Sequence, residues 1–301
     1  MIPYSLRQKW VTPYLFLAPA LLALSLTVFW PALHAFYLSF TEYGYDLTRS
    51  PDWVGLKNFQ TLMGDKVFWQ TLGNTLVYLV GVVPLLVTLP LVLAILVNRQ
   101  LRGIRWFRLA FYTPVVISMV VAGIAWNWLY AEKGLFNQML AVLFAPVPLA
   151  QDWLPIPWLT QPSWAIYSVM AVTVWRGLGY YMVIYLAGLQ AIPQELYEAA
   201  ALDGSDGWQR HWDITLPLMR PYLVLVSIIS SISAMKVFEE IFIMTQGGPR
   251  NGSKTIVYYV YEQAFQNLNI SYACAIGLIL FLMIFILSIL RLVVVPREVD
   301  R

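Results

Sequence analysis

The sequence predicts an all-α polytopic membrane protein with six transmembrane helices, and three observations carry that prediction. Of its 301 residues, 59% are hydrophobic and only 12% are charged, whereas a soluble domain carries about 25% charged residues. Five or six apolar runs are near or above the roughly 20 residues that a helix needs to cross a bilayer. A hydrophilic island, residues 193–217, separates two of these runs.

The six spans follow the apolar runs, with boundaries good to a few residues. We expect them at about 14–38, 70–97, 107–130, 164–191, 220–245 and 272–295. The first run imitates a signal peptide, because basic residues precede it and Ala18-Pro19-Ala20 resembles a cleavage site. That site falls at the start of the run, so we interpret the segment as an uncleaved span.

The distribution of Lys and Arg predicts the orientation of these spans. With the N-terminus inside, eleven Lys and Arg fall in inner segments, six in outer segments and two within spans. Because cytoplasmic loops carry the excess of positive charge, both termini and the island should be cytoplasmic. The net charge of +3 follows from this topology and indicates no nucleic-acid partner. Cys274, the only cysteine, can build neither a disulfide framework nor a thiolate metal site.

The first half of the island predicts a short helix and its end. Pro193 suits a first helical turn, where its missing N–H is not needed. The residues from Glu195 to Leu202 are mostly strong helix formers with acidic side chains near the start. Asp203-Gly204 should end the helix, because glycine tolerates the left-handed conformation just past a helix terminus.

The second half predicts another short helix. Asp206 followed by Gln209 fits a capping box, and Trp208 and Trp212, four residues apart, would share one face. Pro217 should end this helix. Five acidic residues stand against Arg210 alone in the island: Glu195, Glu198, Asp203, Asp206 and Asp213. Anionic lipid headgroups would repel such a loop, so a basic partner surface explains it better than a merely solvated loop, which leaves the tryptophans unexplained.

At this island the sequence resembles the transmembrane permease subunits of ABC importers. In that family E-A-A, a D-G step and, after nine residues, I-x-L-P form the coupling helix that docks into a groove on the ATPase subunit. The matching residues are Glu198, Ala199, Ala200, Asp203, Gly204, Ile214, Leu216 and Pro217. The string Trp53–Phe59, the segment Leu186–Pro193 and the run Thr245-Gln246-Gly247-Gly248-Pro249 also resemble sugar importers, and make the maltose-type permeases the best resemblance.

The resemblance implies a fold, partners and a location. It implies a type I ABC importer permease core at 70–295 within one permease domain, with 14–38 as an extra peripheral helix, in the cytoplasmic (inner) membrane. A second, homologous permease would complete a heterodimer, two ATPase subunits would bind below, and an extracytoplasmic solute-binding protein would deliver a sugar or oligosaccharide. The chain itself would bind no cofactor, since ATP and Mg would sit on the ATPase subunits.

Two of the predicted spans contain charged residues. Arg176 lies near the middle of the fourth span, and an intramembrane charge normally faces protein or water. In the fifth span Lys236 is one turn from Glu239 and Glu240, so the three could pair on one face. Aromatic faces and hydrogen-bonding groups suit neutral sugars. The candidates for sugar contact are Trp175, Tyr180, Tyr181, Glu239 and Glu240, although a packed helix interface would use the same residue types.

Other classes of function lack their motifs. His34 and His211, the only histidines, have no metal-ligand spacing. Gly247 and Gly252 imitate a phosphate loop, but Ser253 stands where that loop requires lysine. A secondary transporter should show an inverted repeat and a channel a repeated filter loop, and neither is visible. Glycerol-phosphate-like and other polyol solutes remain the alternative substrates, and a secondary transporter the less favoured alternative class.

Overall fold

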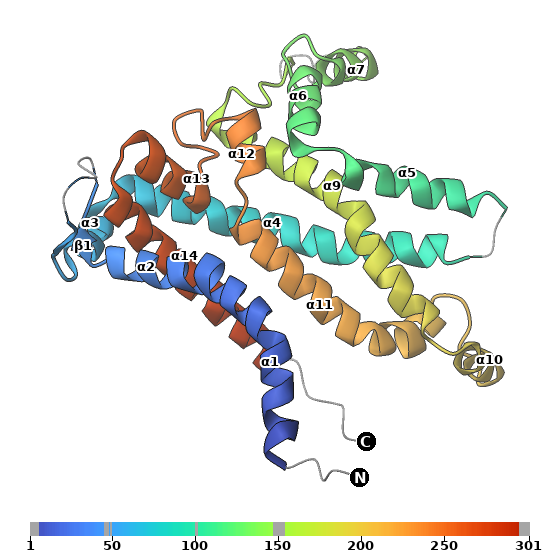
Figure 1. Cartoon of the computed structure of the whole chain (residues 1–301). Helices are drawn as coiled ribbons and strands as arrows, with labels where there is room; N and C mark the ends of the chain where they lie inside the picture. Colours follow the sequence, from blue (N-terminus) through green and yellow to red (C-terminus); the bar gives the residue numbers. More distant parts are fainter. Residues whose placement is uncertain (1–5, 45–47, 49, 100–101, 147–153, 295–301) are drawn as a thin grey trace. The chain divides into compact units, whose positions relative to one another are not determined.

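The computed structural model describes residues 6–44, 48, 50–99, 102–146 and 154–294, and this part of the chain is mostly helical (Figure 1). Its strands form one antiparallel pair of two residues each, β1 (Thr41–Glu42) and β2 (Asp52–Trp53). Five helices are long and apolar enough to cross a membrane, or six if one bent pair counts as a single span. The helical polytopic fold is therefore confirmed. The predicted cytoplasmic ends, 1–5 and 295–301, lie outside the described residues.

Contacts divide the chain into two compact units. The first comprises Met1–Gly64 and Val260–Ile279, and the second comprises Asp65–Tyr259 and Leu280–Arg301. α13 (Ile256–Tyr261) and α14 (Ile270–Val294) each contribute residues to both units.

The first unit contains the predicted peripheral helix. α1 (Leu6–Leu24), a π-helical turn η1 (Ser25–Phe29) and α2 (Trp30–Leu38) follow one another without a break, and Pro13–Leu38 is long and apolar enough to span. Most of its apolar side chains are exposed; Phe16, for example, is 81% exposed. A single helix surrounded by lipid can expose apolar side chains in this way.

Hydrogen bonds fix the loop that follows this helix. Asn58, in α3 (Lys57–Gly64), donates to the carbonyls of Ser39 at 2.9 Å and Thr41 at 2.8 Å. The Thr41 hydroxyl forms a hydrogen bond with the hydroxyl of Ser271 at 3.1 Å. Ser271 lies at the start of α14, which follows the π-helical turn η3 (Glu262–Gln266). These bonds hold the residues from Ser39 to Thr41 against α3 and the start of α14.

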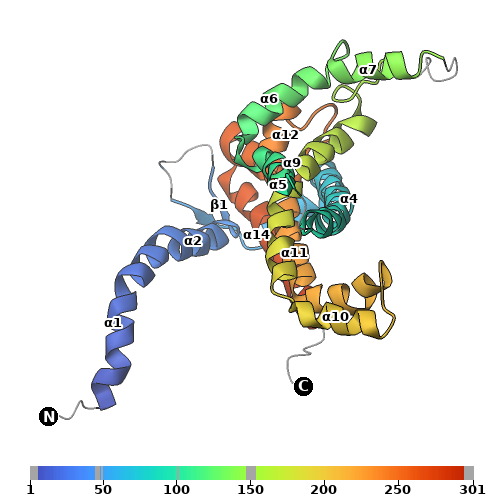
Figure 2. The same ribbon diagram turned by 90° about the vertical axis from the view of Figure 1, so that its right-hand side faces the viewer.

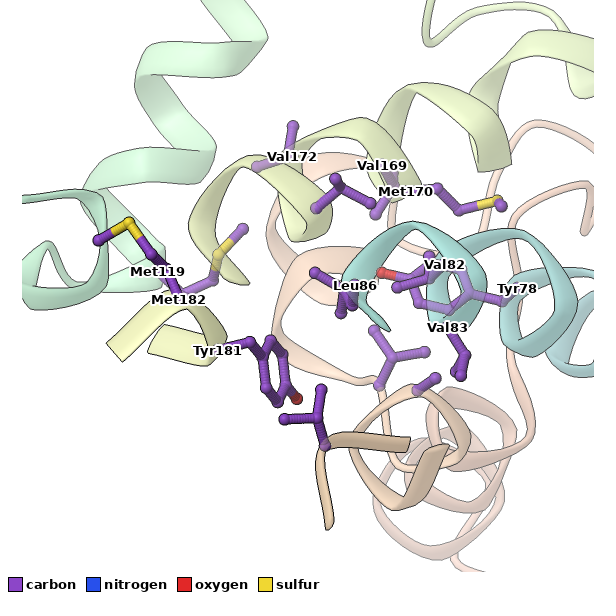
Figure 3. Packing of buried hydrophobic residues seen from close by; sticks show 14 of the residues in the cluster. Tyr78, Val82, Val83, Leu86, Met119, Val169, Met170, Val172, Tyr181 and Met182 are labelled. Atoms are coloured by element: carbon purple, nitrogen blue, oxygen red, sulfur yellow. The ribbon is translucent and has the colours of Figure 1, made fainter. Parts of the chain in front are cut away.

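Three long helices build the core of the second unit. α4 (Lys66–Val97), α9 (Pro162–Gln190) and α11 (Leu216–Met235) pack on one another. Tyr78, Val82 and Leu86 of α4 face Val169 and Met170 of α9 (Figure 3). Such interdigitated apolar side chains hold helices together where lipid tails supply no hydrophobic drive.

The predicted third span, 107–130, is not one straight helix. α5 (Ile104–Val116) and α6 (Met119–Leu129) meet at a bend of 100°. Ile117 at the bend is extended, with φ −72° and ψ 130°. α5 lies so close to α9 that a Cβ on Gly179 would come within 2.2 Å of the Phe111 carbonyl oxygen. Glycine at 179 is therefore what permits this backbone-to-backbone contact.

The loop after the third span holds a helix that the sequence did not predict, α7 (Leu135–Leu143). Asn137 is 5% exposed; its amide group donates to the carbonyls of Ala131, Glu132 and Ile156, and its oxygen accepts from the N–H groups of Ile156 and Trp158. One buried side chain therefore ties α7 to the segment before α9.

The predicted fifth span, 220–245, is also broken. α11 ends at Met235, Lys236 caps it, and a separate short helix α12 (Glu239–Met244) follows. The expectation that Lys236, Glu239 and Glu240 share one helical face is therefore wrong. The Thr255 hydroxyl donates to the carbonyl of Val237 at 3.1 Å, so a neighbouring segment satisfies a backbone group that helix continuation would have used.

Candidate functional site

The island at 193–217 begins with the predicted helix, and that helix ends at the predicted place. α10 (Gln194–Leu202) starts after Pro193. Gly204 has φ +84°, the Ser205 N–H donates to the Ala200 carbonyl at 2.8 Å, and the Gly204 N–H donates to the Ala201 carbonyl at 3.2 Å. These two bonds form a Schellman motif, which requires the left-handed residue that glycine supplies. The expected stop at Asp203-Gly204 is confirmed.

The second half of the island differs from the expected short helix. Its helix passes through a π-helical turn η2 (His211–Thr215) and runs directly into α11, so Pro217 does not end it. Proline clashes with the carbonyl four residues earlier in a regular helix, and the wider π-helical turn just before Pro217 relieves that crowding. The capping box is absent too, because the Asp206 backbone carbonyl accepts from the Gln209 N–H.

Polar bonds fix α10 against the start of α11. The Tyr197 hydroxyl and the His211 ring nitrogen Nδ1 each lie 3.1 Å from the Thr215 hydroxyl, and Thr215 is fully buried. The Ser205 hydroxyl donates to the Asp213 carboxylate at 2.6 Å. The island is therefore a fixed platform at one end of α9 and α11 (Figures 1 and 2).

This platform presents both acidic and large apolar side chains to its surroundings. Leu202 is 91%, Trp208 72% and Trp212 69% exposed, and the five acidic residues of the island are exposed as well. Of the predicted coupling residues, Glu198, Ala199, Asp203, Gly204 and Pro217 are exposed, Ile214 and Leu216 are half-buried, and Ala200 is buried. Exposed tryptophans beside carboxylates are typical of a surface that binds another protein.

A second site, a cavity of about 620 Å³, lies among α4, α9, α11 and α12. Four of the five predicted pathway residues line it, Tyr180, Tyr181, Glu239 and Glu240, and so do the two intramembrane charges, Arg176 and Lys236. The break between α11 and α12 brings Lys236, Glu239 and Glu240 to the cavity wall. Broken helices at membrane depth are tolerated where they line a cavity, so this geometry suits a binding site.

The charges in the cavity are arranged differently from the prediction. In the described part of the chain, no ion pair joins Lys236 to Glu239 or Glu240. The cation that acts electrostatically on Glu240 is Arg176 of α9. The cavity thus presents carboxylates, cations and phenol groups together, a set that can bind the hydroxyl groups of a polar solute.

Trp175 does not line this cavity. Its ring packs edge-on against Trp126, with centroids 5.3 Å apart, in an aromatic cluster that continues through Tyr130 and Phe136. Trp175 therefore takes the other role that the sequence left open, packing between helices.

Sequence reasoning missed several polar and aromatic residues that line the cavity: Thr173, Ser230, Ser233 and Phe238. Thr173 lies three residues before Arg176, and Gly177 and Tyr180 follow at helical spacing. Extending one helical face from Arg176 would have found Thr173. The residues on α11 carry no comparable signal, because serines in an apolar span are also common packing residues.

These features define a class: a polytopic helical membrane protein with a polar cavity among its spans and, at one end of them, a platform with exposed acidic and aromatic side chains. The family model for the "binding-protein-dependent transport system inner membrane component" matches residues 61–299. The chain therefore belongs to this family of membrane transport components.

The relatives are permeases with similar chain lengths. The lactose transport system permease protein LacF of Rhizobium radiobacter is 34% identical over 93% of both chains. The arabinooligosaccharides transport system permease protein AraP of Bacillus subtilis is 32% identical over 95% of this chain and 88% of its own. A probable permease for starch degradation products, AmyD of Thermoanaerobacterium thermosulfurigenes, is 31% identical over 95% of both chains.

Among solved structures, the fold is similar to a chain of a bacterial ABC transporter that imports alginate. The TM-score is 0.82 at 22% sequence identity, covering 98% of each chain. A second structure, of an alginate ABC transporter in complex with its substrate-bound periplasmic protein, gives a TM-score of 0.78 at 23% identity and covers 95% of this chain and 93% of its own. The similarity confirms the predicted type I permease fold.

Proposed function

We propose that this chain forms half of the translocation pathway of an ATP-driven importer for a sugar or oligosaccharide. It works in the inner membrane beside a second, different permease of similar fold. An external binding protein delivers the solute, and two ATPase subunits below bind ATP and Mg. This chain is not catalytic.

The assignment of a sugar as solute rests on the relatives and on the cavity. Three relatives with at least 31% identity carry names that specify lactose, starch degradation products or arabinooligosaccharides. The cavity combines Glu239 and Glu240 with the hydroxyl groups of Tyr180 and Tyr181. Carboxylates accept from sugar hydroxyls and aromatic rings cover the apolar faces of sugar rings, so neutral carbohydrates suit this cavity.

The observation that carries the coupling role is the exposed platform after α9. Its Glu198 and Trp212 are exposed although the turn at Gly204 and the Thr215 bonds hold their backbone in place. When ATP binding closes the ATPase dimer, the platform moves with the groove that holds it and the cavity opens outward. A rigid platform transmits such a displacement without first deforming.

Reconstitution tests the proposal and its alternatives. The chain is assembled in vesicles with its partner permease, ATPase and binding protein, and uptake is measured for lactose, maltotriose, arabinotriose and glycerol 3-phosphate. We expect ATP-dependent uptake of one of the three sugars and no ATP hydrolysis by this chain alone. Uptake of glycerol 3-phosphate only would favour the polyol alternative, and uptake by this chain without ATP would establish a secondary transporter.

The coupling role has its own test within the same assay. Glu198→Lys places a positive charge opposite the basic groove that we propose on the ATPase, and like charges at an interface cost several kcal/mol. We expect copurification of the ATPase and uptake to fall together, while the affinity of the binding protein for its sugar stays unchanged. Normal uptake by Glu198→Lys would contradict the coupling role and leave the solute assignment intact.

A further inference from the structure

Two adjoining hollows lie between the end of α4 and the segment after α10. One measures about 580 Å³ and the other about 180 Å³, and both are lined by Ile95, Arg99, Arg210 and His211. We refer to the two together as the arginine cleft. All of these residues belong to the second unit, and none of them is part of the cavity between the spans.

The two arginines give this cleft a concentrated positive charge. Both lie close enough to act electrostatically on the His211 ring. Within the described residues, neither forms an ion pair. Arg108, by contrast, already donates through Nε and Nη2 to the Val97 carbonyl, at 3.1 Å and 2.6 Å. Arg99 and Arg210 therefore have donor groups free for an anion from outside the chain.

Arg210 is held in place, yet one of its donors is unused. Its guanidinium lies over the Tyr197 ring, 5.3 Å from the centroid, and its Nε is buried without a hydrogen-bond partner in the part of the chain that the structure describes. A buried donor with no partner costs free energy. The neighbouring bonds of Tyr197 and His211 to Thr215 hold the residues around Arg210 in place, so the guanidinium has a fixed position beside the two hollows.

The smaller hollow has a second, apolar wall. Val92 and Leu96 of α4 are 46% and 49% exposed, and Trp208 on the opposite side is 72% exposed. No acidic residue lines this hollow, whereas Glu198 lines the larger one. The smaller hollow therefore offers cations beside apolar surface at the end of a membrane-spanning helix.

We propose that the arginine cleft binds the phosphate group of an anionic phospholipid, with the start of its acyl chain against Val92, Leu96 and Trp208. Basic pockets between helices on the cytoplasmic side bind anionic headgroups, and tryptophan favours the interface between headgroups and acyl chains. Inorganic phosphate presents the same group, but it leaves the apolar wall uncovered. A phospholipid would place its phosphate group at the arginines and its acyl chain on the apolar wall. It would also fix the position of α10 through Tyr197.

The test measures lipid binding by the purified full chain, together with any partner subunits that copurify. Dibrominated phosphatidylglycerol in nanodiscs quenches nearby tryptophans, and the difference between wild type and Trp208→Phe isolates the signal of Trp208. We expect quenching by phosphatidylglycerol to exceed that by phosphatidylcholine. Arg99→Gln should weaken phosphatidylglycerol binding on the order of tenfold, since it removes charge-assisted hydrogen bonds. Arg99 is exposed, so this variant should fold.

Arg105→Gln is the matched control, because it removes one exposed positive charge from the same end of the spans but outside the cleft. It should bind phosphatidylglycerol like the wild type. Equal weakening by both variants would mean diffuse attraction and overturn the proposal. A second arm adds inorganic phosphate to phosphatidylcholine nanodiscs: binding of phosphate that depends on Arg99, without preferential quenching by phosphatidylglycerol, would overturn the lipid as occupant.

Discussion

At the scale of single residues, Gly204 acts through its backbone. Its φ of +84° lies in the left-handed region, and nothing lies within 4 Å of the position that a Cβ would take. A substitution there meets strain and no clash, so its cost depends on how well the new residue tolerates positive φ.

Gly204→Val should therefore cost about 1–2 kcal/mol at this position, whereas Gly204→Asn should cost clearly less. We expect transport and stimulated ATPase activity to follow the order Gly, Asn, Ala, Val, with all variants inserted in the membrane. Vesicle uptake and the thermal stability of the assembled complex measure the series.

Gly64→Ala provides the control, because Gly64 also has open space around it but no positive φ, and it should be neutral. If Gly204→Asn proves as harmful as Gly204→Val, the cause is a side chain that obstructs the docking of the partner, and the explanation from backbone strain is wrong.

The charges in the cavity give a second prediction at this scale. Since Arg176 is the cation that acts on Glu240, Arg176→Gln and Glu240→Gln should show a coupling of about 0.5–3 kcal/mol in assembly or transport. The pair Lys236→Met and Glu240→Gln should be additive within about 0.5 kcal/mol.

Double-mutant cycles on the stability of the purified complex distinguish the two pairings. If Lys236→Met and Glu240→Gln are coupled while Arg176→Gln and Glu240→Gln are additive, Lys236 is the partner of Glu240, as the sequence suggested. Single residues such as Gly204 could be predicted, because a helix stop is a local property. The partner of Glu240 could not, because it depends on how α9 packs beside α12.

At the scale of elements, the two breaks in the spans show why the sequence was insufficient. The stretch 233–243 contains neither glycine nor proline, although it carries Lys236, Glu239 and Glu240. No residue that breaks a helix therefore marks the interruption in the sequence. The break depends on other segments: Thr255 bonds the Val237 carbonyl and Tyr258 stacks on Phe238 with ring centroids 6.2 Å apart.

The bend between α5 and α6 has the same kind of origin. Gly123 of α6 lies against Ile243 of α12, with a Cβ position 2.7 Å from its side chain. The helices that follow the two irregularities, α6 and α12, therefore pack against each other. Periodicity predicts that a segment is helical, but it cannot predict a break that only a neighbouring break stabilises.

Asn137 allows a prediction about the loop that contains α7. Asn137→Leu would leave the buried N–H groups of Ile156 and Trp158 without their acceptor, at about 1–3 kcal/mol for each group left unpaired. We expect a lower melting temperature and faster proteolysis of the loop, measured on the purified chain. Gln138→Leu is the control, since Gln138 is exposed and makes one bond to the Lys133 carbonyl. Equal sensitivity of both variants would show that the Asn137 network does not hold the loop.

At the scale of the whole molecule, composition and spacing predicted the membrane class and the helical island, because hydropathy and turn residues act over short stretches of sequence. They identified Glu239 and Tyr180 as candidates that do line the cavity, but they could not predict that Trp175 lies outside it. Trp175 is one residue from Arg176, and only its packing against Trp126 separates it from the cavity.

Assembly of the whole transporter supplies the last prediction. Trp212 is 69% exposed on the platform, where tryptophan is the residue type most often responsible for binding energy at protein interfaces. Trp212→Ala should weaken the hold on the ATPase by about 2 kcal/mol or more, which is at least tenfold in the dissociation constant. Trp106→Ala, which removes a tryptophan exposed by 74% at the start of α5, should change nothing in the same assay. The measurement is copurification of the ATPase with the membrane-inserted chain at decreasing concentration. Retention of the ATPase by Trp212→Ala, or equal loss by both variants, would mean that the partner docks elsewhere.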